Sequence, residues 1–231
     1  MIIEVNGKKM DLSGQTAFAV REQIGNETDI VILNGFQIEQ DCQLSANDVL
    51  IMIRQGAMPE KEELESMMRA RHTPHVHEKL TTGKVAIAGL GGLGSNIAVM
   101  LARIGVGQLL LVDFDMVEPS NLNRQSYYIS DLGMPKTIAL RKQIEKINPF
   151  IKIETHNVRV TEDNIPELFN GYDIICEAFD KPEAKSMLVN VALNELPYIK
   201  IVSASGMAGY DTSNSIKTVR PMKRLYVCGD M

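Results

Sequence analysis

The first residues whose type and spacing suggest chemistry are the glycines of one short loop, Gly89-Leu90-Gly91-Gly92-Leu93-Gly94. An apolar run precedes the loop, and a segment with helical periodicity follows it. Because glycine has no side chain, the backbone here can turn tightly and approach a phosphate closely. The helix that follows offers free N–H groups and positive potential. The pattern predicts nucleotide binding; the alternative is a tight turn required only for packing.

Polar residues follow the next apolar run, residues 109–112. Asp113 ends that run about 20 residues after the glycines, where a doubly wound fold presents a carboxylate to a ribose hydroxyl. This much suits a nicotinamide dehydrogenase equally well. Asn121 and Arg124 come next, and Lys136 follows Pro135 at a predicted helix start. Arg124 and Lys136 could neutralise the β- and γ-phosphates of a triphosphate; the alternative is that both are ordinary solvated charges.

Strand-like and helical segments alternate from residue 84 onward, and this rhythm predicts a mostly parallel, Rossmann-like sheet with helices on both faces. The expected strands are residues 85–88, 109–112, 151–153, 172–176, 198–202 and 225–228, and the expected helices are residues 95–104, 135–147, 162–169 and 183–196. Residues 84–231 are therefore expected to form one nucleotide-binding domain.

The first part of the chain has a different pattern. Residues 1–56 contain strand-like runs at 2–5, 30–33 and 49–53, a helix-like stretch at 16–24, and the turn pairs Asn6-Gly7 and Asn34-Gly35. This order predicts a small α+β domain. Residues 57–83 are expected to be a helical linker. The histidines at 72, 75 and 77 suggest a metal site, but Pro74 interrupts them, and a solvated linker is the favoured interpretation.

Composition narrows the class of protein. The net charge of −5 gives no general attraction to nucleic acid or to an anionic membrane. The start of the chain lacks the pattern of a signal peptide, and no apolar run is long enough to span a bilayer. The three cysteines form no CxxC pair, so no tetracysteine zinc site is expected. Sparse cysteines and the missing leader predict a cytoplasmic protein.

Several motifs together resemble the adenylation domain shared by ThiF, MoeB and the ubiquitin-activating enzymes, and the chain is most similar to ThiF proteins with an N-terminal carrier-like domain. The resemblance covers most of residues 69–210. It is carried by the glycine loop and by Asp113-Phe114-Asp115, Ser120-Asn121-Leu122-Asn123-Arg124-Gln125, Gly133-Met134-Pro135-Lys136, Ile147-Asn148-Pro149 and Glu177-Ala178-Phe179-Asp180.

The resemblance implies a role for each matching residue. Gly91 and its neighbours would line the α-phosphate, and Asp113 would hold the ribose. Asp180 would bind the Mg²⁺ that bridges the phosphates, as a hard carboxylate should. Arg71 is the positional match to an arginine that reaches into the partner subunit's site, which implies a homodimer; Arg69 is a rival. The full nucleotide-binding set is Gly89, Gly91, Gly92, Gly94, Asp113, Asp115, Asn121, Arg124, Lys136 and Arg71, and Arg124, Lys136 and Asp180 would act in catalysis.

The implied function is ATP-dependent adenylylation of the C-terminal glycine carboxylate of a ThiS-like sulfur carrier, in thiamine thiazole biosynthesis. The alternatives are a non-catalytic nucleotide-binding scaffold and an NAD-dependent oxidoreductase. Cys176 lies in an apolar strand and Cys228 near the end of the sequence, so a thioester step is not expected. Family members continue past Met231 with a loop and a helix, so a C-terminal truncation is expected.

Two further segments have predicted roles. Residues 1–56 resemble the β-grasp carrier ThiS, but Gln55-Gly56-Ala57-Met58 continues the chain where a working carrier ends in a free Gly-Gly. This unit is therefore interpreted as a fused pseudo-carrier. Residues 203–209, a run of small residues after a predicted strand, could approach the nucleotide or the carrier tail; a flexible connection is the alternative.

Overall fold

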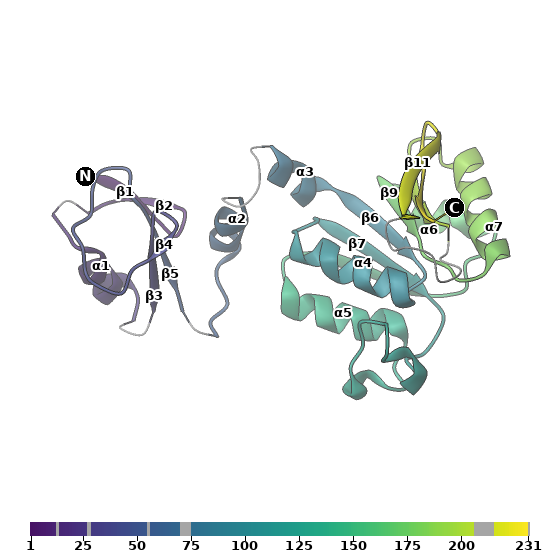
Figure 1. The fold of residues 1–231 in the computed structure, drawn as a ribbon, viewed down its shortest axis with the longest axis horizontal. Helices are drawn as coiled ribbons and strands as arrows, with labels where there is room; N and C mark the ends of the chain where they lie inside the picture. Colours follow the sequence, from purple (N-terminus) through teal and green to yellow (C-terminus); the bar gives the residue numbers. More distant parts are fainter. Residues whose placement is uncertain (13, 27–28, 55, 70–74, 206–214, 231) are drawn as a thin grey trace. The chain divides into compact units, whose positions relative to one another are not determined.

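The computed structural model describes residues 1–231 apart from 13, 27–28, 55, 70–74, 206–214 and 231 (Figure 1). The chain divides into two compact units, Met1–His77 and Glu78–Met231. One short helix, α3 (Val76–Thr82), crosses the boundary between them. Among the described residues, no helix is both long enough and apolar enough to cross a bilayer.

The first unit is a five-stranded sheet with one helix packed on it. Its strands are ordered β2-β1-β5-β3-β4, and β1 runs parallel to β5 while the other neighbours are antiparallel. Asn6 and Gly7 both have positive φ, as the predicted hairpin turn requires. The elements are β1 (Ile2–Val5), β2 (Lys8–Asp11), α1 (Ala17–Ile24), β3 (Ile30–Leu33), β4 (Phe36–Gln37) and β5 (Val49–Ile53).

One face of this sheet forms the core of the unit, where Ile3, Val5, Val31 and Leu50 pack against Val20 of α1. The opposite face carries the alternate side chains of the same strands. Ile30 and Ile53 are cross-strand partners and remain 44% and 40% exposed. The α+β arrangement predicted for residues 1–56 is confirmed, and the unit keeps an apolar outer sheet face.

Helices occupy the segment that follows. α2 (Lys61–Arg69) begins near Glu62 and Glu63, acidic residues that suit the positive end of a helix. In α3, His77 is only 3% exposed, so the expectation of a solvated linker is wrong for this residue, which lies on the buried side of the helix. His75 is exposed, and His72 lies outside the described residues.

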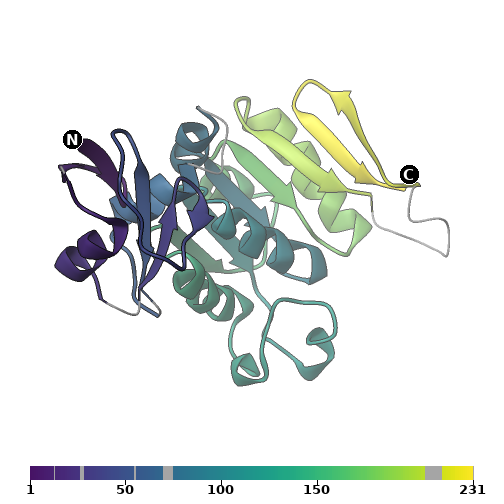
Figure 2. The same ribbon diagram turned by 60° about the vertical axis from the view of Figure 1, so that its left-hand side comes forward.

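The second unit is a doubly wound α/β domain built on a seven-stranded sheet, ordered β11-β12-β10-β9-β6-β7-β8. All neighbouring strands are parallel except β11 and β12, which form the antiparallel hairpin at one edge of the sheet (Figure 2). The predicted fold class is therefore confirmed. The strands are β6 (Lys84–Ala88), β7 (Gln108–Asp113), β8 (Lys152–Asn157), β9 (Ile174–Glu177), β10 (Lys200–Ala204), β11 (Lys217–Met222) and β12 (Leu225–Gly229).

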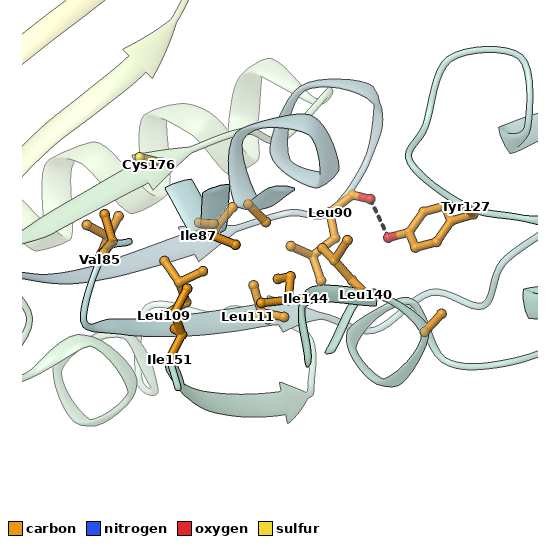
Figure 3. Packing of buried hydrophobic residues seen from close by; sticks show 14 of the residues in the cluster. Val85, Ile87, Leu90, Leu109, Leu111, Tyr127, Leu140, Ile144, Ile151 and Cys176 are labelled. Carbon is orange, nitrogen blue, oxygen red and sulfur yellow. Dashed lines mark hydrogen bonds between the residues drawn. The ribbon is translucent and has the colours of Figure 1, made fainter. Parts of the chain in front are cut away.

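Helices cover both faces of this sheet because its central strands are apolar on both sides. In β7, Leu109 and Leu111 pack with α4 and α5, while Leu110 and Val112 pack with α6 and α7. Figure 3 shows the first of these two clusters, with Leu109 and Leu111 near Leu140 and Ile144 of α5. The helices are α4 (Gly92–Arg103), α5 (Lys136–Ile147), α6 (Ile165–Phe169) and α7 (Pro182–Glu195).

Several boundaries differ from the sequence prediction. Two expected strands, residues 172–176 and 198–202, begin two residues later, as β9 and β10. The helix expected at residues 162–169 starts only at Ile165, as α6, because the Asn164 side chain accepts a hydrogen bond from the Thr161 N–H and forms a turn. The edge strand β11 was not predicted, because all six of its residues are exposed and its pattern lacks a buried face.

Candidate active site

The sheet reverses its winding direction between two central strands. The chain passes from β6 to β7 and β8 on one side, and then returns to β9 and β10 on the other side of β6. In open α/β sheets, ligands bind at the carboxyl ends of the strands at such a switch point. Here that point lies between the loop after β6, residues 89–94, and the turn after β9, residues 178–181.

Two glycines of the loop are required for packing. Gly89 has φ +90°, and a Cβ there would lie 2.9 Å from the carbonyl oxygen of Ala178. A Cβ at Gly94 would overlap the carbonyl oxygen of Gly89. The β6–α4 loop and the turn after β9 therefore meet backbone to backbone, as only glycine allows.

The other two glycines leave room instead. Gly91 occupies the N-cap position of α4, and a Cβ added there would meet no atom within 4 Å. A Cβ at Gly92 would touch only the aliphatic part of Arg124, 3.5 Å away. The first N–H groups of a helix have no intrahelical acceptor, so α4 directs donors and positive potential into this open space. The cradle fits a phosphate group.

Asp113 is buried, at 7% exposure, and its carboxylate holds the loop. One oxygen accepts the Leu90 N–H at 2.6 Å, and the other accepts the Asp115 N–H at 2.8 Å. These two bonds tie the end of β7 to the glycine loop. Contact with a ribose would use the remaining lone pairs of the carboxylate, and this role stays a prediction.

Lys136 is buried at the start of α5 and is already paired. Its ammonium lies 2.8 Å from the carboxylate of Asp115, a side chain that is 49% exposed. The Lys136 N–H also donates to the Asp115 carbonyl, and the neighbouring backbone is bridged between Met116 and Pro135. The structure therefore brings together two predicted site residues that are 21 positions apart in the sequence.

Arg124 and Asn121 lie in the segment between β7 and α5. Arg124 is exposed; its side chain packs beside Gly92, and its guanidinium donates to the Ser120 carbonyl and to Asn123 Oδ1. Asn121 is buried, and its Oδ1 accepts the Glu118 N–H in a capping box. Arg124 is thus placed beside the phosphate cradle. The side-chain oxygen of Asn121, Oδ1, instead stabilises the turn in which Asn121 lies.

Sequence reasoning missed the polar residues that hold this segment against α4. Asn96 donates from Nδ2 to the carbonyls of Gly92, at 2.6 Å, and Arg124, at 3.1 Å. Ser126 donates to Asn96 Oδ1 from its hydroxyl and to Ser95 Oγ from its backbone. Asn96 lies two residues past the last glycine, and a polar side chain at the start of this largely apolar helix was the available signal.

Tyr127 ties the segment between β7 and α5 to the glycine loop. Its hydroxyl donates to the Leu90 carbonyl at 2.8 Å, a bond drawn in Figure 3. Burial, followed by the nearby carboxylate of Asp113, raises the pKa of Tyr127 well above its usual range. The phenol therefore stays protonated and keeps donating to the glycine loop at any physiological pH.

Asp180 lies in the turn after β9. Its side chain is exposed, and the N-cap position of α7 is Lys181, so Asp180 does not cap that helix. No hydrogen bond to its carboxylate is seen among the described residues. Arg71 lies outside the described residues, and so do residues 206–209 of the small-residue loop; nothing is described of the Arg69 side chain.

The donor set can be tested against the expected ligands. Within the described part of the chain, no three His, Cys, Asp or Glu side chains cluster as a metal site. A single exposed carboxylate at Asp180 fits a Mg²⁺ that is held mainly by phosphate oxygens and water. Gln125 Oε1 and Thr137 Oγ1 are buried and have no partner in the described structure; they directly follow Arg124 and Lys136. The residues present fit Mg²⁺ and a nucleoside triphosphate.

Cys176 lies in β9 within the apolar cluster that lines α4 and α5. Burial raises the pKa of its thiol to about 11. The nucleophile in thiol chemistry is the thiolate, and at neutral pH this group is almost entirely protonated. The geometry agrees with the expectation that Cys176 forms no thioester.

Taken together, the doubly wound sheet, the glycine cradle and the flanking cations define an α/β protein with a candidate site whose chemistry suits a nucleoside triphosphate. The model of the ThiF family matches residues 65–228, and a ThiS-like ubiquitin model matches residues 1–56. The chain therefore belongs to the ThiF family and carries an N-terminal ThiS-like unit.

Individual relatives support the same placement. The adenylyltransferase and sulfurtransferase UBA4 of Saccharomyces cerevisiae is 38% identical over 151 residues, which are 64% of this chain and 34% of that protein. The sulfur carrier protein adenylyltransferase of Thermus thermophilus is 34% identical over 138 residues, 58% of this chain and 51% of that protein. The chain thus spans between a third and a half of the length of these relatives.

Among solved structures, E. coli tRNA N6-threonylcarbamoyladenosine dehydratase, TcdA, in complex with ATP is similar with a TM-score of 0.64. The identity is 24%, and the match covers 71% of this chain and 68% of that one. At this identity the likeness establishes the fold.

Gly91 faces the open cradle, whereas Gly94 is required for backbone packing, so substitutions at the two positions should have different effects. We expect Gly91→Ala to change the free energy of unfolding by less than about 1 kcal/mol, because its Cβ meets no protein atom, yet to weaken ATP binding at least about tenfold by filling the cradle. The control Gly94→Ala should destabilise the fold by roughly 2 kcal/mol or more through overpacking. Urea unfolding and titration calorimetry measure the two quantities; equal effects of both variants on stability would contradict the assignment.

The raised pKa of Cys176 predicts its reactivity. Because the thiolate is favoured only above about pH 11, roughly one thiol in a thousand is ionised at pH 8. Iodoacetamide at that pH should leave Cys176 unmodified in the folded protein, while the half-buried Cys42 and Cys228 react. Mass spectrometry of the digested protein provides the measurement, and denatured protein provides the control in which all three react. Equal native rates at Cys176 and Cys228 would contradict the prediction.

Proposed function

We propose that this protein is an ATP-dependent adenylyltransferase that activates the C-terminal glycine carboxylate of a ubiquitin-like sulfur carrier. The observation that carries the proposal is the open cradle at Gly91, at the N-terminus of α4, with the Arg124 side chain packed beside it. The buried Lys136 is connected to the glycine loop by hydrogen bonds that run through Asp115 and Asp113. A nicotinamide dehydrogenase needs the glycines but has no use for two cations along a phosphate tail.

The proposed reaction needs no nucleophile from the protein. The carrier carboxylate attacks the α-phosphorus of ATP and forms a new O–P bond. The bond between the α-phosphorus and the oxygen that bridges it to the β-phosphate breaks, and pyrophosphate leaves. The N–H groups of α4 would stabilise charge that develops on the α-phosphate, and Arg124 and Lys136 would hold the leaving pyrophosphate. Asp180 would hold Mg²⁺, which supplies further charge neutralisation when bound.

The pairing of Lys136 with Asp115 supports this role. A buried ammonium group needs a compensating charge, and the Asp115 carboxylate provides it. An ammonium group also has three donors, so Lys136 can keep Asp115 and still meet a phosphate oxygen. The pair would thus hold a charged cation in place before ATP arrives.

We propose a ThiS-like carrier with a Gly-Gly tail, and a role in making the thiazole of thiamine, because the chain carries a ThiS-like unit of its own. A homodimer in which Arg71 completes the partner's site follows from the family resemblance. A nucleotide-binding scaffold without turnover is the alternative.

The ThiS-like unit itself is proposed to act as a pseudo-carrier. β5 ends at Ile53, and the chain continues into α2, so no free carboxylate follows the last strand. Such a unit cannot be adenylylated at that point. Its outer sheet face, which includes the exposed cross-strand pair Ile30 and Ile53, gives it a surface for docking or regulation.

ATP–pyrophosphate exchange tests the proposed activity. With Mg²⁺, the full chain should catalyse exchange only when a carrier ending in Gly-Gly is present. Asp180→Ala should lower the rate at least about a hundredfold because it removes the carboxylate proposed to bind the metal. Glu183→Ala is the matched control, since Glu183 is an exposed carboxylate three residues away in the first turn of α7.

The other outcomes separate the alternatives. ATP binding without exchange would favour the scaffold, and a chain that binds NAD but no ATP would favour the oxidoreductase. An absence of ATP binding would remove the adenylyltransferase proposal altogether.

Deletion of residues 1–56 tests the pseudo-carrier. Since the unit offers a surface and no substrate carboxylate, we expect its removal to change the carrier concentration at half-maximal exchange, or the stability of the chain. Ile30→Lys in the full chain is a milder variant, because Ile30 lies on the exposed face and not in the core. Unchanged carrier dependence and unchanged unfolding in both variants would contradict a docking or regulatory role.

A further inference from the structure

Glu177 is a fully buried carboxylate at the carboxyl end of β9, and the proposed reaction does not use it directly. Its side chain is 0% exposed. One oxygen accepts the Phe179 N–H at 2.7 Å and the Lys185 ammonium at 3.0 Å. The other accepts Lys185 at 3.1 Å and the hydroxyl of Ser203.

The partners of Glu177 come from three separate elements. Phe179 belongs to the turn after β9, Lys185 to α7, and Ser203 to β10. Burying an ion pair in this way is costly unless hydrogen bonds satisfy every charge, and an apolar pair of similar volume often gives equal stability. Stability alone therefore does not account for a buried ion pair at this position.

The turn that Glu177 holds is the one that carries Asp180. On its other side, the Ala178 N–H donates to the Ala88 carbonyl at 2.9 Å, and the Ala178 carbonyl lies against Gly89. Asp180 itself is exposed, and no contact to its carboxylate is seen in the described structure. The position of that carboxylate is therefore set by the backbone of the turn.

We propose that the Glu177–Lys185 pair is a positioning device for Asp180: it fixes the turn after β9 against the glycine loop, so that the Asp180 carboxylate is ready for Mg²⁺ on the phosphates. This inference rests on the proposed function. Glu177 touches neither nucleotide nor metal and acts only through the backbone of residues 178–180.

A purely structural brace is the competing explanation, and one double variant distinguishes the two. Glu177→Met combined with Lys185→Met replaces the pair by apolar side chains of similar volume, which commonly keeps a fold intact. Glu177→Gln alone leaves Lys185 buried without its counter-ion and risks unfolding. Asp180→Asn serves as the reference for loss of the metal carboxylate. Replacing the exposed pair on α5, as Arg141→Met with Glu145→Met, is the matched control.

The measurement is the ATP affinity of the full chain with and without Mg²⁺, by titration calorimetry. We expect Mg²⁺ to tighten ATP binding about tenfold in the wild type, the size of a typical coupling between two ligands. The Met double variant and Asp180→Asn should both lose most of this gain while their Mg²⁺-free affinities stay within about twofold. The α5 control should keep the gain. The Met double variant should stay folded but melt at a lower temperature than the wild type, because the Phe179 N–H and the Ser203 hydroxyl lose their acceptor.

Two results would overturn the positioning role: a Met double variant that keeps the full Mg²⁺ gain, or one whose loss is matched by an equal loss of Mg²⁺-free affinity.

Amide hydrogen exchange tests the same inference without a ligand. The Ala178 N–H keeps its acceptor in the double variant, so it should exchange at least about tenfold faster only if the turn has loosened.

The Ile175 amide, within β9, should exchange as in the wild type. Unchanged exchange at Ala178 would overturn the inference even if the wild type bound no ATP. A wild type that binds no ATP, together with faster exchange at Ala178, would reject the proposed function and leave the positioning of the turn supported.

Discussion

The carbonyl oxygen of Gly89 leaves no room for a side chain at position 94, and the carbonyl oxygen of Ala178 leaves none at Gly89. These two close approaches bring the loop after β6 and the turn after β9 together, at the point where the sheet reverses direction. Every other part of the site is placed relative to that junction. α4 starts from it, and Asp113 ties the end of β7 to it through the Leu90 N–H.

Buried acids fix the backbone around the candidate site. Asp113 and Glu177 are each less than a tenth exposed, and each accepts a backbone N–H beside the cradle: Asp113 that of Leu90, and Glu177 that of Phe179. A buried carboxylate is stable only when its lone pairs are satisfied, so each one specifies the conformation of its loop. The groups left toward solvent are different ones: Arg124 and Asp180, one cation and one anion, as the proposed magnesium–triphosphate ligand would require.

The sequence predicted those parts that depend on local pattern. The glycine loop, the β–α alternation and the Asn6-Gly7 turn all follow from a few adjacent residues, and the structure has them. Parts that depend on distant residues were missed. Lys136 looked like a free cation because Asp115 is 21 positions away, and the backbone N–H groups that Asp113 accepts could not be seen in the sequence. β11 was missed because an exposed edge strand has no buried face to give it a period of two.

Asn121 shows a different limit. Its capping contact with Glu118 is local, three residues away, and could have been predicted from the turn that contains Pro119. The family resemblance placed it in the nucleotide-binding set instead. The structure permits both, because the cap uses only Oδ1 and the amide nitrogen can still donate. A residue that both shapes its turn and meets the ligand would couple the two, since losing the cap would also displace Arg124, whose N–H donates to the Asn121 carbonyl.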